Sequence, residues 1–264
     1  MKKIVFTVTV VLLVIAFGVS AFFVGNYLIE GKQQEDRYDQ LAQAVSEAQA
    51  ATRPTAAPTK DSSTEATTSA TEPTMIPGYE ELYKENPDTV GWLKIEGTKL
   101  NYPVMQTPED PQFYLYKDFD KKDSKRGCVF AWAAADLNEP SDNITLFGHN
   151  MADGTMFAAL NSYTNKNTWD RNSLIFFDTL TEYHTYKIFA VFKTSANVGE
   201  GFSYHQFVDA DNEAEFDEFV KTCKDLAFYD TGITPKYGDK LICLSTCEYS
   251  QDNGRLVVAA VRIT

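Results

Sequence analysis

Short apolar segments, many of them alternating with polar residues, recur along the chain from about residue 90 to its end. They are rich in Val, Ile, Leu, Phe and Tyr, and turn residues such as Glu96-Gly97 and Asp252-Asn253-Gly254 separate them. Eight segments are predicted strands: 90–95, 100–105, 128–132, 144–147, 173–178, 185–193, 240–246 and 256–263. Eight strands in one domain favour a mostly β fold built as a closed or nearly closed barrel.

Two stretches between these strands change to helical spacing. From Asp211 to Tyr229 the apolar residues recur every three to four positions: Phe216, Phe219, Val220, Cys223 and Leu226. This pattern predicts one amphipathic helix with Cys223 on its buried face, where a thiol acts as core filler. A shorter helix is predicted from Thr155 to Tyr163.

The N-terminus carries the longest apolar run of the chain, from Ile4 to Val24, preceded by Lys2 and Lys3. At ~1.5 Å per residue this run covers the ~30 Å hydrocarbon core of a bilayer. The positive-inside rule then predicts a single-pass signal-anchor over residues 1–29, with the N-terminus in the cytoplasm and the rest outside the cell. A cleaved signal peptide is the alternative, but the run is longer than a usual signal sequence. Both interpretations export the remainder of the chain.

Residues 30–77 are predicted to form a stalk and a linker. Gln33 to Thr52 is rich in helix formers but poor in large apolar side chains, which indicates a short solvated helix. Arg53 to Pro77 consists mainly of Thr, Ala, Ser, Pro and Glu, a composition that cannot repay the entropy of ordering. The folded domain is therefore predicted at 78–264.

Charge and cysteine spacing exclude some classes of function. A formal net charge of -13 argues against nucleic acid as a partner, because such partners require concentrated Lys and Arg. Cys243 and Cys247 lie roughly 13 Å apart on an extended strand, beyond the ~7 Å limit for a disulfide. No Cys-x-x-Cys pair or Cys/His cluster with zinc spacing occurs in the sequence, so neither a metal nor a cofactor is expected.

One cysteine differs from the other three in its position. Cys247 ends the predicted strand 240–246 and precedes the polar segment 248–254, where a thiol is accessible. Arg255 opens the next strand, which is expected to pair antiparallel with the first. Its guanidinium then returns to the neighbourhood of Cys247, where a fixed cation can stabilise an oxyanion.

A cysteine nucleophile with an ordinary pKa of about 8.5 is mostly protonated at neutral pH, so it needs a histidine or another cation nearby. Three histidines occur: His149, His184 and His205. A histidine that follows a strand is by itself more often a packed or surface residue than a catalyst. His149 follows the strand 144–147 and a glycine, whereas His184 lies in a predicted hairpin turn and His205 in a Gly/Ser/Tyr-rich loop.

These motifs resemble the sortase family. Leu244-Ser245-Thr246-Cys247 is similar to the sortase signature Thr-Leu-x-Thr-Cys, Gly148-His149 to the sortase histidine, and Arg255 to the arginine that follows the cysteine. The segments 90–95, 101–104 and 148–151 resemble the class B branch. One departure is Cys243, which stands where the signature has threonine; we interpret it as a packing substitution.

The resemblance implies an eight-stranded sortase barrel with a few flanking helices and a cysteine transpeptidase activity. Such an enzyme cleaves a C-terminal sorting signal of surface proteins through a thioester and transfers them to an amine of a peptidoglycan precursor or a pilin. It implies Cys247 as nucleophile, His149 as acid and base, and Arg255 as oxyanion stabiliser, with Thr246 and Ser245 in substrate binding or oxyanion support. It implies no calcium site and no cofactor.

Two rival functions remain open at the level of sequence. A cell-wall cysteine peptidase would use water as acceptor, although papain-like enzymes place the cysteine before the histidine, the reverse of the order here. A non-enzymatic surface binding module would need no nucleophile, and the joint occurrence of Cys247, His149 and Arg255 argues against it.

Overall fold

The computed structural model describes residues 2–52, 74–197 and 199–264 of the chain. The predicted linker from Arg53 to Pro77 lies mostly outside these residues. The structure divides into two compact units, Met1–Gln40 and Leu41–Thr264, and each is described by itself.

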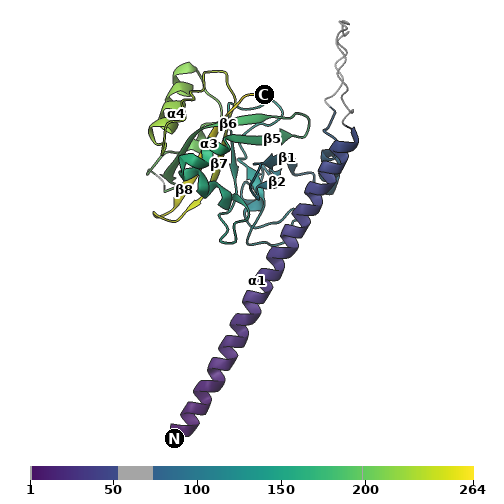
Figure 1. The fold of residues 1–264 in the computed structure, drawn as a ribbon, viewed down its shortest axis with the longest axis vertical. Coiled ribbons are helices and arrows are strands. Elements are labelled where there is room, and N and C mark those ends of the chain that lie inside the picture. The colour runs from purple at the N-terminus through teal and green to yellow at the C-terminus, as the bar shows by residue number, and fades with distance from the viewer. Residues whose placement is uncertain (1, 53–73, 198) are drawn as a thin grey trace. The chain divides into compact units, whose positions relative to one another are not determined.

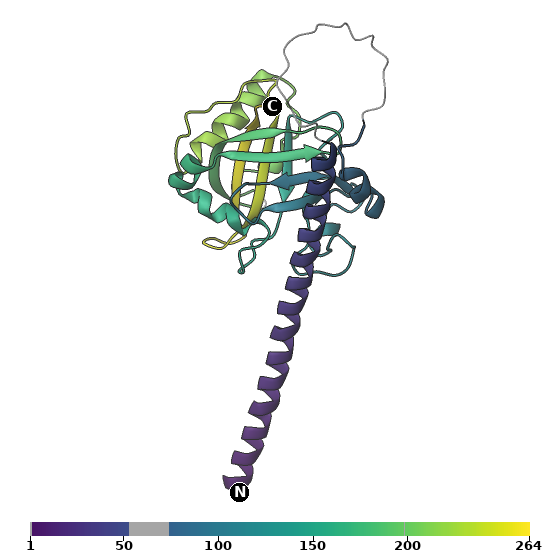
Figure 2. The ribbon, with the colours of Figure 1, turned by 45° about the vertical axis from the view of Figure 1, so that its right-hand side comes forward.

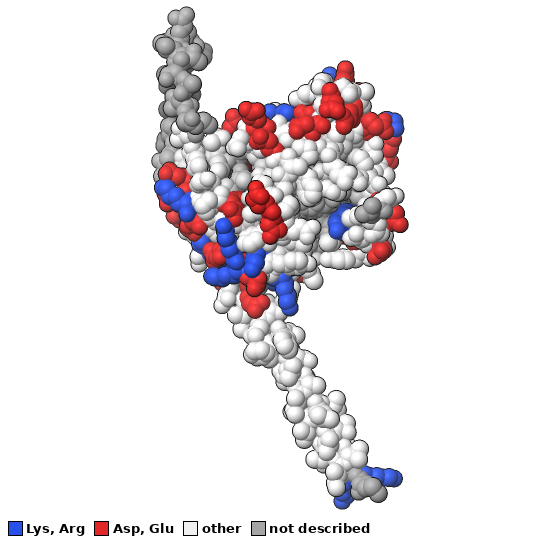
Figure 3. Space-filling view, turned by 180° about the vertical axis from the view of Figure 1, so that it is seen from behind, with Lys and Arg blue, Asp and Glu red and all other residues white. Residues whose placement is uncertain are grey.

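A single long helix, α1 (Lys2–Thr52), forms the first unit and continues into the second. Its stretch Lys2–Ala50 contains a window of mean hydropathy 2.7, and no residue of that window is buried. Figure 3 shows this part of the helix as an uncharged rod with basic side chains at its N-terminal end. Length and composition therefore fit a membrane anchor, as predicted.

The last turns of α1 belong to the second unit and differ from a solvated stalk. Leu41 and Val45 are buried there. Gly78, with φ of 90°, lies so close to this helix that a Cβ on it would be 2.9 Å from the Cα of Val45. A glycine is required at such a close approach with a positive φ. Leu41 and Val45, which belong to the predicted stalk, thus pack within the second unit.

Eight strands form the closed barrel of the second unit, in the order β1-β2-β3-β4-β7-β8-β6-β5 (Figure 1). Their bounds are β1 Thr89–Lys94, β2 Asn101–Met105, β3 Val129–Ala131, β4 Asn143–Phe147, β5 Leu174–Thr179, β6 Thr185–Ser195, β7 Leu241–Glu248 and β8 Gly254–Arg262. Each begins and ends within two residues of a predicted strand. The prediction of an eight-stranded barrel is confirmed.

Helix α4 (Glu213–Asp225) covers one side of the barrel wall (Figure 2). The side chain of Asn212 caps its N-terminus by accepting from the backbone N–H of Glu215. Its apolar face packs against alternate residues of β7 and β8. The members of this cluster from the three elements are Phe216, Phe219, Val220, Cys223, Leu241, Cys243, Val257, Ala259 and Val261. The predicted helix with a buried Cys223 is therefore present.

The remaining helical elements are short. The segment predicted as a helix over 155–163 is a 3₁₀ helix, η2 (Phe157–Thr164). The others are α2 (Tyr79–Glu85), η1 (Phe113–Leu115), α3 (Lys166–Arg171) and η3 (Tyr204–Gln206). Elements of three to seven residues contain too few turns to give a periodic apolar pattern, so sequence periodicity does not reveal them.

Two strand pairings bring the ends of three strands together at one edge of the barrel. β4 pairs in parallel with β7, and β7 pairs antiparallel with β8. Parallel neighbours end at the same edge of the sheet, whereas an antiparallel neighbour starts there. The C-terminal ends of β4 and β7 and the N-terminal end of β8 therefore lie together at one rim of the barrel.

Candidate active site

Cys247 and Arg255 are directly opposite each other at this rim. They are register partners in the pairing of β7 with β8, and both are half-buried. One nitrogen of the Arg255 guanidinium donates to the carbonyl oxygens of Gly254, at 2.9 Å, and Asn253, at 3.3 Å. The predicted return of the guanidinium to the neighbourhood of the cysteine thus follows from the strand register.

His149 reaches the same rim from β4. Phe147 on β4 is the register partner of Ser245 on β7, so His149 and Cys247 each lie two residues further along neighbouring strands. The pairing continues past the strand end, where the Gly148 N–H donates to the Ser245 carbonyl at 3.2 Å. The Thr246 hydroxyl then donates to the Gly148 carbonyl at 2.8 Å. The parallel pairing thus places His149 at the rim where the antiparallel pairing places Cys247 opposite Arg255.

The His149 ring is oriented by a backbone carbonyl. Its Nε2 lies 2.8 Å from the carbonyl oxygen of Leu115, which can only accept, so Nε2 carries the proton of this bond. In the neutral ring Nδ1 is then the acceptor. The Tyr116 ring packs at 5.8 Å between ring centroids from the imidazole. The ring is therefore fixed in tautomer and position by the segment around η1.

A buried guanidinium holds together the two segments that contact His149. Arg126, 9% exposed in its side chain, forms an ion pair with Asp153 and donates to the Thr155 hydroxyl at 2.8 Å. Next to it, Gly127 has a φ of 56°, and a Cβ there would be 2.5 Å from the Leu115 carbonyl oxygen. Arg126 thus joins the loop after His149 to the chain beside Leu115. Only the guanidinium side of this ion pair is buried, since the Asp153 side chain is 39% exposed.

Ser245 and Thr246 are buried, and both hydroxyls are engaged within the fold. The Ser245 Oγ lies 2.5 Å from the hydroxyl of Tyr204, whose pKa burial raises to about 12. The Thr246 hydroxyl is bound to the Gly148 carbonyl, as described above. Both hydroxyl groups are therefore bonded to protein atoms next to Cys247 in the chain.

The other two histidines lie elsewhere. His205, in η3, packs at 5.1 Å between ring centroids from Trp132. Burial, and secondarily the charge of Arg255, lowers its pKa, so it borders the site as a neutral ring. His184 is buried just before β6, where burial and then Arg262 lower its pKa. His205 was not selected from the sequence, because nothing in its loop reveals that it returns to Arg255.

None of the four cysteines, all of which lie in the described part of the chain, forms a disulfide, and three of them are buried: Cys128, Cys223 and Cys243. Burial raises the pKa of the Cys223 and Cys243 thiols above the ordinary value. Cys247 is partly exposed. A nucleophile must reach its substrate as a thiolate, so the rim position distinguishes Cys247 from the other three.

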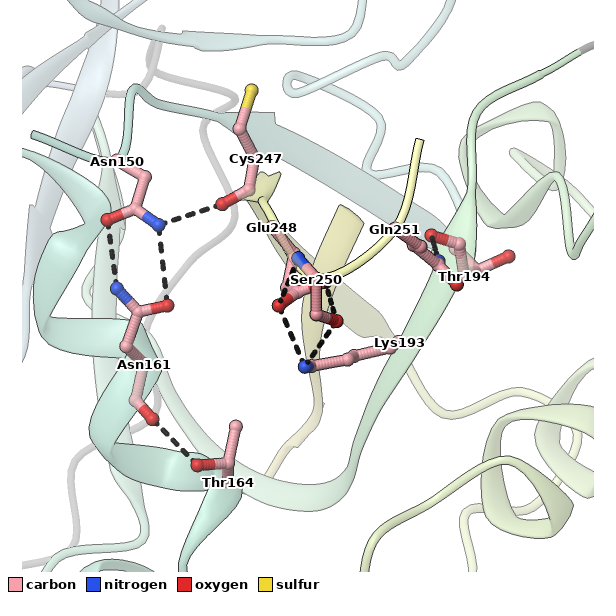
Figure 4. Close-up of polar contacts among 9 residues, drawn as sticks. All are labelled: Asn150, Asn161, Thr164, Lys193, Thr194, Cys247, Glu248, Ser250 and Gln251. Atoms are coloured by element: carbon pink, nitrogen blue, oxygen red, sulfur yellow. Dashed lines mark hydrogen bonds and ion pairs between the residues drawn. The ribbon is translucent and has the colours of Figure 1, made fainter. Parts of the chain in front are cut away.

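Besides His205, three groups beside the site were not found from the sequence: the Leu115 carbonyl, Arg126 and Asn150. A backbone carbonyl has no residue-type signal, and Arg126 is surrounded in sequence by charged residues typical of a surface loop. Asn150 follows His149 directly, and its side-chain amide donates to the Cys247 carbonyl at 2.8 Å (Figure 4). Its adjacency to the histidine is the one sequence signal that points to it.

Comparison with known proteins identifies the family. Residues 93–263 match the Sortase domain model. The chain is 27% identical to sortase B of Staphylococcus aureus over 256 residues, covering 96% of this chain and 95% of that protein. It is 30% identical to sortase B of Listeria monocytogenes over 188 residues, covering 70% and 73% of the two chains.

The fold agrees with solved structures. A Staphylococcus aureus sortase B–substrate complex superposes with a TM-score of 0.75 at 27% identity, covering 89% of this chain and 99% of that one. Most of the barrel and its rim are thus shared with an enzyme whose substrate complex is known. The chain belongs to the sortase family, with sortase B proteins as its relatives, and is a cysteine transpeptidase that sorts surface proteins.

Proposed function

We propose that Cys247 is the nucleophile of the transpeptidation, His149 its acid and base, and Arg255 its oxyanion stabiliser. The observation that carries this proposal is the strand register: Cys247 opposes Arg255 across β7 and β8, and β4 delivers His149 to the same rim. Cysteine, histidine and a fixed cation at one accessible edge are what acyl transfer requires.

In the first half-reaction, the Cys247 thiol gives its proton to Nδ1 of His149, and Cys247 Sγ attacks a backbone carbonyl carbon within the sorting signal of a surface protein. The carbonyl oxygen becomes an oxyanion, which the Arg255 guanidinium and a backbone N–H at or near Cys247 stabilise. When the C–N bond breaks, the leaving amine takes a proton from His149. A thioester on Cys247 remains, and Ser245 and Thr246 support the floor of the site.

The second half-reaction transfers the acyl group to an amine. The nitrogen of the incoming amine attacks the thioester carbon, and His149 accepts the proton that this nitrogen loses. His149 then returns a proton to the departing sulfur, which regenerates the Cys247 thiol. A sortase B has been solved in complex with triglycine. This supports an amine acceptor here, from a peptidoglycan precursor or a pilin, in place of water.

The N-terminal helix supports a location for the enzyme. We propose that residues 1–29 anchor the chain in the cell membrane as a single pass, that 30–77 form the stalk and linker, and that 78–264 act outside the cell. The apolar stretch of α1 and its basic N-terminal flank support this orientation. Protease added to intact cells is expected to cut within 53–77 and release the domain; cutting only after lysis would contradict the orientation.

Mass spectrometry tests the reaction directly. The full chain in detergent is incubated with a library of candidate sorting peptides, and its intact mass is recorded before and after addition of triglycine. An increase by the mass of the acyl fragment, removed by triglycine as a new peptide product, is the expected result. Release only as the hydrolysed acid, at a rate that triglycine does not change, would favour a peptidase instead.

A further inference from the structure

The residue after His149 contacts the backbone of Cys247. Asn150 Nδ2 donates to the Cys247 carbonyl at 2.8 Å, across the gap between the ends of β4 and β7 (Figure 4). We propose that Asn150, oriented by Asn161, is a positioning residue that holds Cys247 in place relative to His149. This inference rests on the proposed function of those two residues.

The orientation of the Asn150 amide is determined by its partner. Asn161 Nδ2 donates to Asn150 Oδ1 at 2.8 Å, and Asn150 Nδ2 lies 3.4 Å from Asn161 Oδ1 in return. If the Asn150 amide were rotated by 180°, its oxygen would face the Cys247 carbonyl oxygen and two acceptors would repel. Asn161 therefore keeps the N–H group of Asn150 directed at the nucleophile's backbone.

The backbone of Asn150 is also restrained. It forms an antiparallel bridge with Met156, a buried residue whose φ is 53°. A positive φ of this kind is uncommon in residues other than glycine. The Phe157 N–H donates to the His149 carbonyl at 2.9 Å. The Tyr249 hydroxyl donates to the Asn150 carbonyl at 3.4 Å. The loop that follows His149 is thus held by bonds within the loop and by a bond to Tyr249, beyond Cys247. These bonds keep Asn150 at a fixed position relative to His149 and Cys247.

Fixing the Cys247 carbonyl has a consequence for the chemistry. In a trans peptide the C=O and the following N–H point in opposite directions. The Asn150 bond therefore also fixes the peptide plane that joins Cys247 to Glu248. The Cys247 sulfur points away from the cluster of Lys193, Glu248 and Ser250 in Figure 4. A backbone that is held rigidly at Cys247 keeps the sulfur in position relative to the reacting carbonyl.

Four variants of the full chain in detergent test the proposal: Asn150→Ala, Asn161→Ala, the double variant, and Thr164→Val as control. Thr164 lies in the same 3₁₀ helix, and its hydroxyl donates to the Asn161 carbonyl at 2.9 Å without touching the amide pair. Steady-state cleavage is measured with the peptide that acylates the parental chain fastest in the library. Thermal unfolding of each variant reports its folding.

We expect Asn150→Ala to lower kcat about 10-fold or more, with KM changed less than about 2-fold, because a positioning bond acts on the chemical step. Asn161→Ala should lower kcat less, and the double variant should match Asn150→Ala, because the two act as one unit. Thr164→Val should retain the parental kcat. Asn161 is exposed, so its variant is expected to fold even if Asn150→Ala does not.

Two results would overturn the inference while leaving the proposed function intact: parental kcat in Asn150→Ala, or fully additive losses in the double variant, which indicate separate structural roles. A parental chain that no peptide acylates would instead refute the proposed function, and this inference with it. The two failures are distinguished by the parental reaction alone.

Discussion

Cys243 and Cys247 lie four residues apart on β7 and, by the two-residue period of a strand, on the same face of the sheet. Over Cys243 this face is covered by α4, and the thiol is fully buried with a raised pKa. Cys247 lies beyond that cover, at the rim, opposite Arg255 and partly exposed. A cysteine side chain thus fills the core in one region and is proposed as the nucleophile in the other. The two regions differ in whether α4 covers the thiol and in which polar groups lie next to it.

Exchange of either cysteine gives the largest contrast between the two regions. Cys247→Ala should abolish thioester formation while leaving the unfolding midpoint within a few degrees of the parent, because no buried contact is lost. Cys243→Ala should keep activity and lose about 1 kcal/mol of stability, the cost of a small cavity in the packed layer under α4. Acylation assays and thermal unfolding on both variants give the answer; cleavage by Cys247→Ala would refute the assignment.

The neighbour of Cys247 is the second point of difference. Arg255→Lys replaces a planar donor fork by a mobile point charge, so the rate of acyl-enzyme formation should fall about 10² to 10³-fold. The unfolding midpoint should hardly change, since a partly exposed charge at a strand start contributes about 0 to 1 kcal/mol. Single-turnover acylation and thermal unfolding of the same sample separate the two effects. A variant that acylates at the parental rate would remove Arg255 from the site.

The rim lacks the cover of α4, so its loops must be held by polar contacts. Arg126→Met removes the buried guanidinium that joins Asp153 and Thr155 to the chain beside Leu115. We expect a loss of about 2 kcal/mol of unfolding free energy, because the hydrogen bond from the buried charge to Thr155 and the ion pair with the partly exposed Asp153 are both lost. The matched control is Lys166→Met, whose ion pair with Asp170 is exposed and should contribute less than about 0.5 kcal/mol. Equal losses of unfolding free energy in denaturant titrations of Arg126→Met and Lys166→Met would contradict this structural role of Arg126.

His205, which lies beside Arg255, should make the stability of the fold weakly dependent on pH. The pKa of His205 is lowered from 6.5 by burial and by Arg255, so the unfolded chain binds this proton more readily than the folded one. Stability from this group is complete above about pH 6.5 and declines as the pH falls through the lowered pKa. His205→Gln should therefore flatten the decline of the unfolding midpoint between pH 6.5 and pH 5. A decline as steep as that of the parent would assign it to other groups.

The sequence predicted what depends on strand pattern and strand order. All eight strands follow from apolar runs and turns, and the opposition of Cys247 and Arg255 follows from their being joined by a short polar loop. The position of His149 needed the parallel pairing of β4 with β7, strands separated by nearly a hundred residues. That pairing depends on packing of the whole barrel, and only the resemblance to sortases anticipated it.

What the sequence did not reveal is how the site is held. The Leu115 carbonyl acts through the backbone, and its position depends on a positive-φ glycine in another loop. The Asn150 amide depends on an exposed residue of η2, a 3₁₀ helix whose spacing suggested an ordinary helix. Such contacts between loops leave no periodic trace, because each involves one residue from each segment.

The location of the acyl group on the chain tests the central contrast most directly. Trypsin cuts after Lys240 and Arg255, so Cys243 and Cys247 fall within one peptide, 241–255, whose fragment ions distinguish them. After brief incubation of the full chain with its best library peptide and quenching in acid, tandem mass spectrometry should find the acyl mass on Cys247 and none on Cys243. Acyl mass on Cys243, or equal acylation in Cys247→Ala, would contradict the assignment of the rim cysteine as nucleophile.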